Sequence, residues 1–551
     1  MRSSNVPMNM NKKTFITNKD KKEIVDFYMA KKNSAIKLLI NLLIVFFVFG
    51  CTSGKKHSPD VLQSMETLSA DELYAYVDTL SSDRFEGRLS GHEGYDKAAE
   101  WVVKKFKEWG VQPVNDEIGY LQKFAHPYTD VFEGSVVQMI DEDGQVIKNY
   151  EYVEEFIPGS TSGNGQVDAE VVYVGYGITA PELGYDDYAN VDVQDKIVLM
   201  EREVPVNAGH ENFIDWRPYS FHQYKLINAY KHGAAGFLYN YHIGNPNNAY
   251  IEDLILSYVG DKVVADIFEG TGFKHEDLVQ KIDSLLKPQS FNTNKRFSVK
   301  NNTKHHPEGV TSNVIGFIEG SDPELKDEYI ILGGHLDFLG RCYEIMPGAN
   351  DNASAVSINL SLARALSDEN IKLKRSVLFL MFGAEEAAIK GAQYFLKNPP
   401  VPVDQMVALL NMDGVGIGDK IWTGFAENYP DLYDYIEEAN ANYVEANLKG
   451  GYVNNITRPR LDAAFFDWYG IPSLSFSAYG DLPQNKAYRY HTTYDNIDNI
   501  TPEIMESLSK ILFLSVIDMA NDENLNLKRG EQKTEFIEEY DFYSIVEKNL
   551  N

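Results

Sequence analysis

Short apolar runs alternate with helical segments along the second half of the chain, from Thr311 onwards. The runs are rich in Val, Ile, Leu and Phe, which predicts buried strands. Residues 353–368 and 431–444 read as helices between them. The predicted strands lie in NVIGFIEG, EYIILGGHLD, RSVLFLMFGAEE, MVALLNMDGVG and IPSLSFSA. Such alternation predicts an α/β domain with a mostly parallel sheet and helices on both faces.

The first half of the chain has a different pattern. Residues 71–115 predict two helices around a polar, glycine-rich turn, and residues 130–160 predict short strands. Two β-branched runs follow, Val171–Tyr176 and Lys196–Met200, and then a helix and a strand within His232–Tyr241. This order, over about 150–295, resembles the protease-associated domain, a β-rich insert of several exopeptidases. The segment itself indicates a separate module without a cluster of metal ligands.

Composition is that of a globular protein with more than one domain. The 551 residues are 44% apolar and 24% charged. Lys and Arg number 51 against 81 Asp and Glu, a net charge of -30 that repels nucleic-acid phosphates. We therefore expect no nucleic-acid partner. Cys51 and Cys342 are too few for a disulfide framework.

Residues 1–51 predict an export segment. The apolar run Leu38–Gly50 follows three lysines and is shorter than the ~20 residues of a spanning helix. Its end, Val-Phe-Gly-Cys, resembles the bacterial lipobox, in which the cysteine is acylated after cleavage. We expect Cys51 to be lipidated and the protein to be an exported lipoprotein, anchored in a membrane and facing the periplasm or the cell surface. Met29 precedes the lysines and is the expected true start.

Ionisable residues gather at the carboxyl ends of the predicted strands, where open parallel sheets bind ligands. They are His335, Asp337, Asp351, Glu385, Glu386, Asp413 and His491. One such residue alone is usually solvated or caps a helix, but several at consecutive strand ends indicate a site. Two His and three carboxylates suit zinc, and one bridging carboxylate would hold two ions ~3.5–4 Å apart. One carboxylate of the Glu pair is then left as a general base.

The motifs GGHLD, PGANDNASAV, FGAEEAAIKGA, NMDGVG and YHTTYDNID occur in that order, and FEGRLSGHEGYDKAAEWVVKKF precedes them. Together they resemble the co-catalytic zinc aminopeptidases, bacterial leucyl-aminopeptidase-like metallopeptidases. The resemblance implies a three-layer phosphorylase/aminopeptidase-like fold. Residues 57–150 would form its N-terminal part and 300–525 its catalytic domain, followed by a charged tail over 526–551.

The resemblance also implies the metal ligands. His335 and Asp413 would bind one zinc ion, and Glu386 and His491 the other. Asp351 would bridge the two ions, followed by a non-proline cis peptide at Asp351–Asn352. Cobalt and manganese also fit these ligands.

The same match implies roles beside the metals. Glu385 would be the general base that takes a proton from the metal-bridging water. Asp337 would orient His335, and Asp495 would orient His491. Tyr490 would either donate a hydrogen bond to the oxyanion or pack against neighbouring side chains.

Four other residues lie outside this set of ligands and their partners. Asp462 matches the acidic position of the family's Ser-Asp-His segment, but Leu461 and Ala463 replace the Ser and His. Cys342 is expected to be a small buried or loop residue, with a soft metal contact as the alternative. Arg84 and Arg88 are expected to cap or pair on the surface, with a place along the cleft as the alternative.

The function expected from all this is hydrolysis at peptide N-termini, with peptides as substrates. One alternative is a glutaminyl cyclase, an acyl transferase on the same fold that works with one zinc ion. Another is a binding protein without catalysis. Carboxypeptidase or dipeptidase action would use the same metals, so the choice of the N-terminus rests on the resemblance.

Overall fold

The computed structural model describes residues 57–457, 459–481 and 488–540. The chain divides into two compact units, Met1–Leu62 and Gln63–Asn551, and both large sheets belong to the second unit. The predicted export segment, with Met29 and Cys51, lies outside the described residues. Among the described residues, no helix is both long and apolar enough to cross a membrane.

The first large sheet is mixed, with the strand order β1-β14-β18-β15-β19-β22-β20-β21. Its central strands β18, β15, β19 and β22 are parallel. On one side, β14 pairs antiparallel with β18 and with β1. On the other side, β20 pairs antiparallel with β22 and parallel with the edge strand β21. The strands are β1 (Leu121–Ala125), β14 (Val310–Ile318), β15 (Tyr329–His335), β18 (Ser376–Phe382), β19 (Met406–Met412), β20 (Lys420–Gly424), β21 (Leu448–Gly450) and β22 (Ser473–Tyr479). The predicted fold class is confirmed.

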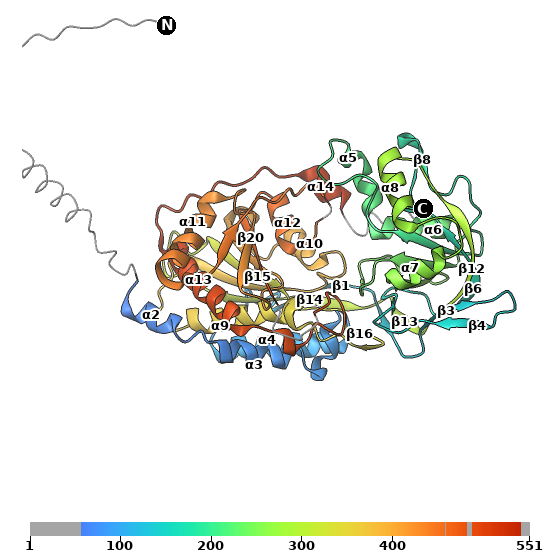
Figure 1. The fold of residues 1–551 in the computed structure, drawn as a ribbon. Helices are drawn as coiled ribbons and strands as arrows, with labels where there is room; N and C mark the ends of the chain where they lie inside the picture. The colour runs from blue at the N-terminus through green and yellow to red at the C-terminus, as the bar shows by residue number, and fades with distance from the viewer. Residues whose placement is uncertain (1–56, 458, 482–487, 541–551) are drawn as a thin grey trace, which may run out of the picture. The chain divides into compact units, whose positions relative to one another are not determined.

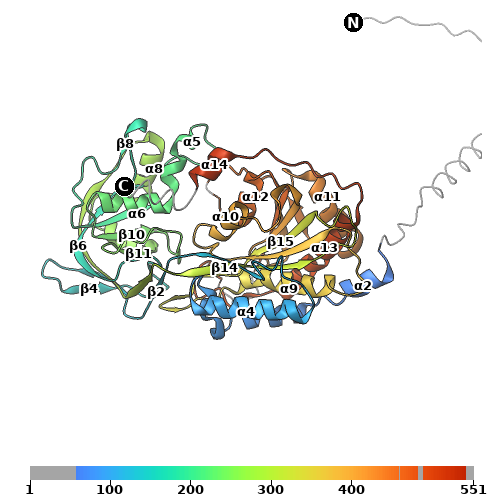
Figure 2. The ribbon, with the colours of Figure 1, turned by 180° about the vertical axis from the view of Figure 1, so that it is seen from behind.

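Helices cover both faces of this sheet (Figures 1 and 2). The helices α3, α4, α9 and α13 lie on one face, where α9 packs on β15 and α4 on β14; α12 packs on β19 and β22 from the other face, beside α10. Every residue of β18 is buried, because a central parallel strand is covered on both sides. The helices are α3 (Ala70–Leu80), α4 (Glu93–Glu108), α9 (Ser354–Leu366), α10 (Lys390–Lys397), α11 (Pro430–Ala439), α12 (Asp462–Trp468) and α13 (Pro502–Asn521).

A second sheet, with the order β4-β3-β12-β6-β9-β10-β11-β5, forms a separate module that we call the β-rich module. Its strands run from Val136 to Asn301, so it takes in β3 and β4 from before residue 150. The strands are β3 (Val136–Ile140), β4 (Val146–Asn149), β5 (Phe156–Pro158), β6 (Gly165–Tyr173), β9 (Ile197–Glu201), β10 (Gly236–Asn240), β11 (Ile255–Val259) and β12 (Phe291–Asn301). Its helices are α5 (Phe213–Trp216), α6 (His222–Lys231), α7 (Asp261–Phe268) and α8 (His275–Leu285), and β7 (Thr179–Ala180) pairs with β8 (Tyr185–Asp186).

A small sheet, β13-β2-β16-β17, brings the two regions together. The chain returning from β15 to α9 contributes β16 (Arg341–Cys342) and β17 (Glu344–Ile345), and β16 pairs with β2 (Tyr128–Val131), which is followed by β3. Strand β13 (Thr303–His306) pairs with β2 directly after β12 ends. The short helices α2 (Pro59–Met65) and α14 (Thr534–Glu539) complete the described α-helices. The loop that carries the ligand motifs is thereby joined to the β-rich module.

Stability of the β-rich module should depend on pH through Asp187. Its carboxylate is buried and accepts hydrogen bonds from Ile178 N (3.0 Å) and Tyr185 Oη (3.0 Å). Burial raises the pKa of Asp187 to about 7, above the ~3.9 of an unfolded chain. The folded state therefore binds more protons between these values, and the contribution to stability is lost as pH rises through about 7.

We expect the urea concentration at the unfolding midpoint to decrease as the pH rises from 5 to 8 in the wild type. The decrease should be smaller in Asp187→Asn. The exposed Asp192→Asn is the matched control and should keep the wild-type slope. Equal slopes in the wild type and both variants would contradict this assignment.

Candidate metal centre

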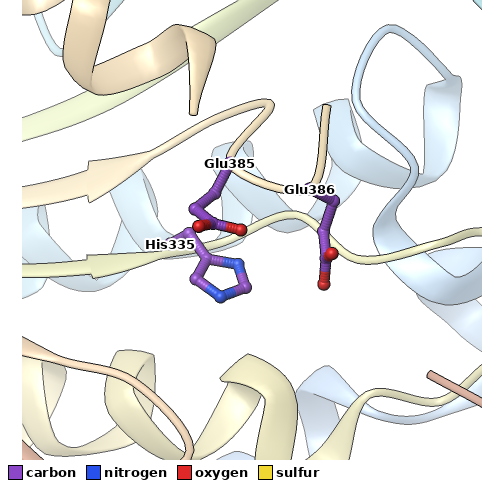
Figure 3. A group of neighbouring side chains, drawn as sticks. All are labelled: His335, Glu385 and Glu386. Carbon is purple, nitrogen blue, oxygen red and sulfur yellow. The ribbon is translucent and has the colours of Figure 1, made fainter. Parts of the chain in front are cut away.

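The predicted site residues lie at one edge of the first sheet. His335 is the last residue of β15, Asp413 follows β19 directly, and Glu385 and Glu386 lie in the turn after β18. These strands are parallel neighbours, so their carboxyl ends meet. Figure 3 shows Glu385 and Glu386 projecting from their turn, with the carboxylate of Glu385 against the imidazole of His335. Alternation of strand and helix thus brings together residues that are far apart in sequence.

Asp351 lies between two groups of side chains. One of its oxygens, Oδ1, is 3.1 Å from His335 Nε2, and the other, Oδ2, is 3.2 Å from His491 Nε2. His335 Nε2 is also 3.5 Å from Asp413 Oδ1, and His491 Nε2 is 3.0 Å from Glu386 Oε2. Two triads that could each hold a cation therefore share one carboxylate. The non-proline cis peptide expected after this residue is present, between Asp351 and Asn352.

The chemistry of these groups fits two cations. His491 Nε2 and Glu386 Oε1 are buried without a hydrogen bond among the described residues. Burial disfavours a charged imidazole, but the carboxylates of Asp351 and Asp413 outweigh it and raise the pKa of His335 well above its usual range. A buried place that favours positive charge and offers nitrogen and oxygen donors suits zinc.

Asp337 acts on this site differently from the sequence expectation. His335 Nδ1 lies 3.1 Å from the backbone oxygen of Asp337, whereas the carboxylate oxygen Oδ1 is 3.8 Å away and too far for a hydrogen bond. That carboxylate accepts instead from the backbone N–H groups of Glu385 (3.1 Å) and Glu386 (3.4 Å). Asp337 therefore fixes the turn that carries both glutamates and orients His335 through its main chain.

Asp495 is also placed differently. Expected to orient His491, it accepts from the backbone N–H groups of Asn350 (2.7 Å) and Asp351 (2.9 Å). The partner of His491 Nδ1 is the backbone oxygen of Gly244, at 2.8 Å, and Gly244 N donates back to His491 O at 3.0 Å. The β-rich module therefore orients a candidate metal ligand of the other region. A backbone carbonyl carries no sequence signal, so this contact could not be found from the sequence.

Tyr490 is half-exposed, and its ring stacks on that of His491 with centroids 3.7 Å apart. With Glu385, Glu386 and His491 it lines a cavity of about 260 Å³.

Asp462 is buried at the start of α12, and neither of its carboxylate oxygens has a hydrogen bond among the described residues. Cys342 is buried as expected, with its thiol 3.2 Å from Pro158 O, and it belongs to none of the described ligand triads.

Arg88 is not on the surface, where it was expected, nor is it a cleft residue. It is fully buried, and its guanidinium donates to four backbone oxygens. They are those of Leu80 (2.7 Å), Pro347 (2.8 Å), Gly348 (2.8 Å) and Leu336 (2.9 Å). The side chain thus fixes the segments after His335 and before Asp351. Arg84, four residues earlier, is exposed.

We expect Arg88→Met to lower the free energy of unfolding by about 3 kcal/mol or more, because several buried carbonyls would lose a charged donor. Arg84→Met is the matched control and should change it by less than about 0.5 kcal/mol. Urea unfolding followed by circular dichroism measures both. Equal small changes in the two variants would show that Arg88 does not stabilise these loops.

The comparisons with known proteins agree with this geometry. Residues 313–516 match the model of peptidase family M28. This part of the chain is similar to the M28 peptidases, and we call it the M28-like domain. It contains every one of the candidate ligands, and the predicted class of enzyme, a metallopeptidase, is confirmed.

Similarity to curated relatives extends beyond residues 313–516. The chain is 24% identical over 493 residues to "probable leucine aminopeptidase 2" of Aspergillus oryzae, covering 84% of each chain. It is 26% identical over 364 residues to "Aminopeptidase YwaD" of Bacillus subtilis, covering 63% of this chain and 68% of the relative.

Among solved structures, an aminopeptidase from Aneurinibacillus sp. strain AM-1 aligns with a TM-score of 0.57 at 22% identity, over 86% of this chain and 97% of that one. BSAP, a zinc aminopeptidase from Bacillus subtilis, aligns with a TM-score of 0.56 at 18% identity, over 84% and 98%. These likenesses support the fold of the M28-like domain together with the β-rich module.

Proposed function

We propose that the protein is a two-zinc aminopeptidase that hydrolyses the first peptide bond of peptides. The observation that carries the proposal is Asp351, whose two oxygens face two separate ligand triads. A shared carboxylate of this kind is the means by which two ions are held close together. In this assignment His335 and Asp413 hold one ion, and His491 and Glu386 hold the other.

Zinc ions bound there would supply Lewis acidity to the scissile carbonyl and to the attacking water. The protein's own part falls to Glu385, which is not needed as a ligand and lies in the same turn as Glu386. Burial, together with neighbouring carboxylates such as Asp462, raises the pKa of Glu385 well above its usual range. A carboxylate with raised pKa is suited to take the proton from the attacking water and give it to the leaving amine.

Action at the N-terminus is proposed from the relatives, two of which are named aminopeptidases. In this proposal the half-exposed Tyr490, which lines the same cavity as Glu385, donates a hydrogen bond to the oxyanion. Asp337 and Asp495 act as positioning residues for the glutamate turn and for Asp351. A glutaminyl cyclase remains the second candidate, and the metal count per chain separates it from the peptidase.

We propose that the β-rich module is a protease-associated insert. Its support is the second sheet, which is separate from the M28-like domain, and the Gly244 carbonyl that it contributes to His491. The insert in this proposal is part of the catalytic site and not only an accessory domain.

We also propose that the protein is an exported lipoprotein anchored through Cys51. The support is the sequence alone: the lysines, the short apolar run and the lipobox-like end. Cys51→Ser would move the protein from the membrane fraction to the soluble fraction of the producing bacterium. A soluble wild-type protein would contradict the anchor.

Metal analysis and peptide hydrolysis test the enzyme proposal together. On protein that starts at residue 52, we expect two zinc ions per chain and hydrolysis of amino-acid p-nitroanilides that a chelator abolishes. One zinc ion per chain, no anilide hydrolysis and cyclisation of an N-terminal glutamine would favour the cyclase. Protein that binds no metal would be a binding protein.

A further inference from the structure

His491 has an uncommon backbone conformation for a candidate metal ligand. Its φ of 54° lies in the left-handed region, which a residue with a Cβ atom keeps only where its surroundings hold it. The side chain is buried, with Nε2 3.0 Å from Glu386 Oε2 and 3.2 Å from Asp351 Oδ2. The contacts that hold the chain on either side of His491 therefore decide where this nitrogen lies.

Arg489, two residues before His491, is attached to the β-rich module. Its Nη1 lies 3.0 Å from Oε2 of Glu154, and its Nη2 donates to the backbone oxygen of Val153. The same Nη2 lies 3.4 Å from Nε2 of His242. These partners come from the loops that follow β4 and β10, so two loops of the module hold the chain before the histidine.

Tyr494, three residues after His491, is held by the same carboxylate. Its hydroxyl donates to Oε1 of Glu154 at 2.5 Å, and the guanidinium of Arg489 lies over its ring, 5.4 Å from the centroid. The hydroxyl of Thr492 donates to Arg489 O at 2.7 Å and accepts from Tyr494 N at 3.2 Å, which closes the loop between them. One carboxylate of the β-rich module thus holds the residues on both sides of His491.

Stability of the whole chain does not explain these contacts. The side chains of Arg489 and Glu154 are 30% and 47% exposed, and an exposed ion pair contributes little to the free energy of unfolding. The groups that orient a metal ligand, in contrast, have a large effect on metal affinity. Loss of Glu154 should therefore change the position of the histidine loop without unfolding the protein.

We propose that Glu154 is a positioning residue for His491 and sets how tightly one of the two metal ions is held. The inference rests on the two-ion proposal, and it gives the β-rich module control over the ion that His491 and Glu386 hold. Glu154 acts through the loop and does not touch the substrate. Because the ion pair with Arg489 is exposed, salt screens it and weakens this control.

Release of zinc to a chelator tests this role on zinc-loaded protein that starts at residue 52. Glu154→Ala should speed the release of one ion roughly 10-fold, while the other ion leaves at nearly the wild-type rate. Tyr494→Phe removes only the hydroxyl group and should act in the same direction with a smaller effect. Glu151→Ala removes an exposed carboxylate from the same loop as Glu154 and is the matched control.

Salt separates positioning from a general loosening of the fold. When NaCl is raised from about 0.05 M to about 0.5 M, the same ion should leave faster in the wild type and in Glu151→Ala, because the ion pair is screened. Glu154→Ala has no ion pair between residues 154 and 489, so its release rate should change less.

Three results would overturn the role of Glu154. In one, Glu154→Ala and Tyr494→Phe release both ions like the wild type. In another, both ions leave faster to the same extent, or Glu151→Ala has the same effect as Glu154→Ala. In the last, salt changes the wild type and Glu154→Ala alike. Any of these results with two ions in the wild type rejects this inference alone, whereas a wild type that binds fewer than two ions rejects the two-ion proposal with it.

Discussion

Glu385→Gln should lower kcat for peptide hydrolysis roughly 10²–10⁴-fold while the protein keeps both metal ions. The amide has almost the same shape as the carboxylate but cannot accept a proton. Glu385 belongs to neither of the triads that share Asp351, so the ligands of both ions remain. Steady-state kinetics on Leu-p-nitroanilide and metal analysis of the same preparation measure the two quantities.

Glu386→Gln is the matched comparison, since it makes the same change one residue further along the turn. It removes the carboxylate that lies 3.0 Å from His491, so it should lower the metal content as well as the activity. If Glu385→Gln loses metal to the same extent, Glu385 is a ligand and not the base. If Glu385→Gln retains near-normal kcat, another group takes the proton from the attacking water.

Asp351→Asn should abolish activity and prevent both ions from binding at normal affinity. Each of the two oxygens of Asp351 faces a different imidazole, at 3.1 Å and 3.2 Å. An asparagine keeps one oxygen and presents an NH₂ group, which cannot bind a cation, to the other triad. Metal content measured after dialysis should therefore fall from two ions to less than one.

The exposed Asp368, just after α9, supplies the control, and Asp368→Asn should retain both ions and full activity. A variant Asp351→Asn that keeps one ion per chain at full occupancy would show that the triads bind independently. Retention of two ions would refute the bridging role.

The clustering of the candidate ligands could be predicted because it depends on the strand pattern. The parallel strands β15, β18 and β19 bring their ends together wherever such runs alternate with helices, and the polar residue that follows each run is visible in the sequence. The direction of the strands near the edges of the sheet was harder to predict from the sequence, because it depends on which segment folds back.

The hydrogen-bonding groups that position the candidate metal ligands could not be predicted, because they depend on loop conformation. Asp337 and Asp495 lie near the expected candidate ligands, yet their carboxylates accept hydrogen bonds from backbone N–H groups and not from the histidines. Arg88 resembled an ordinary surface arginine in the sequence, but its four acceptors are backbone oxygens. Lys390 lies within a recognised motif, and only the fold shows that its side chain is buried.

The reciprocal contact between His491 and Gly244 has a consequence for the history of this chain. A module of this kind is often regarded as an independent unit that can be gained, lost or exchanged without harm to the neighbouring domain. Here His491 depends on a main-chain atom of the β-rich module, so a replacement module would have to reproduce the loop around Gly244. The two parts are therefore constrained to diverge together, and a chimaera of two distant relatives would lose the orientation of His491 before it lost its fold.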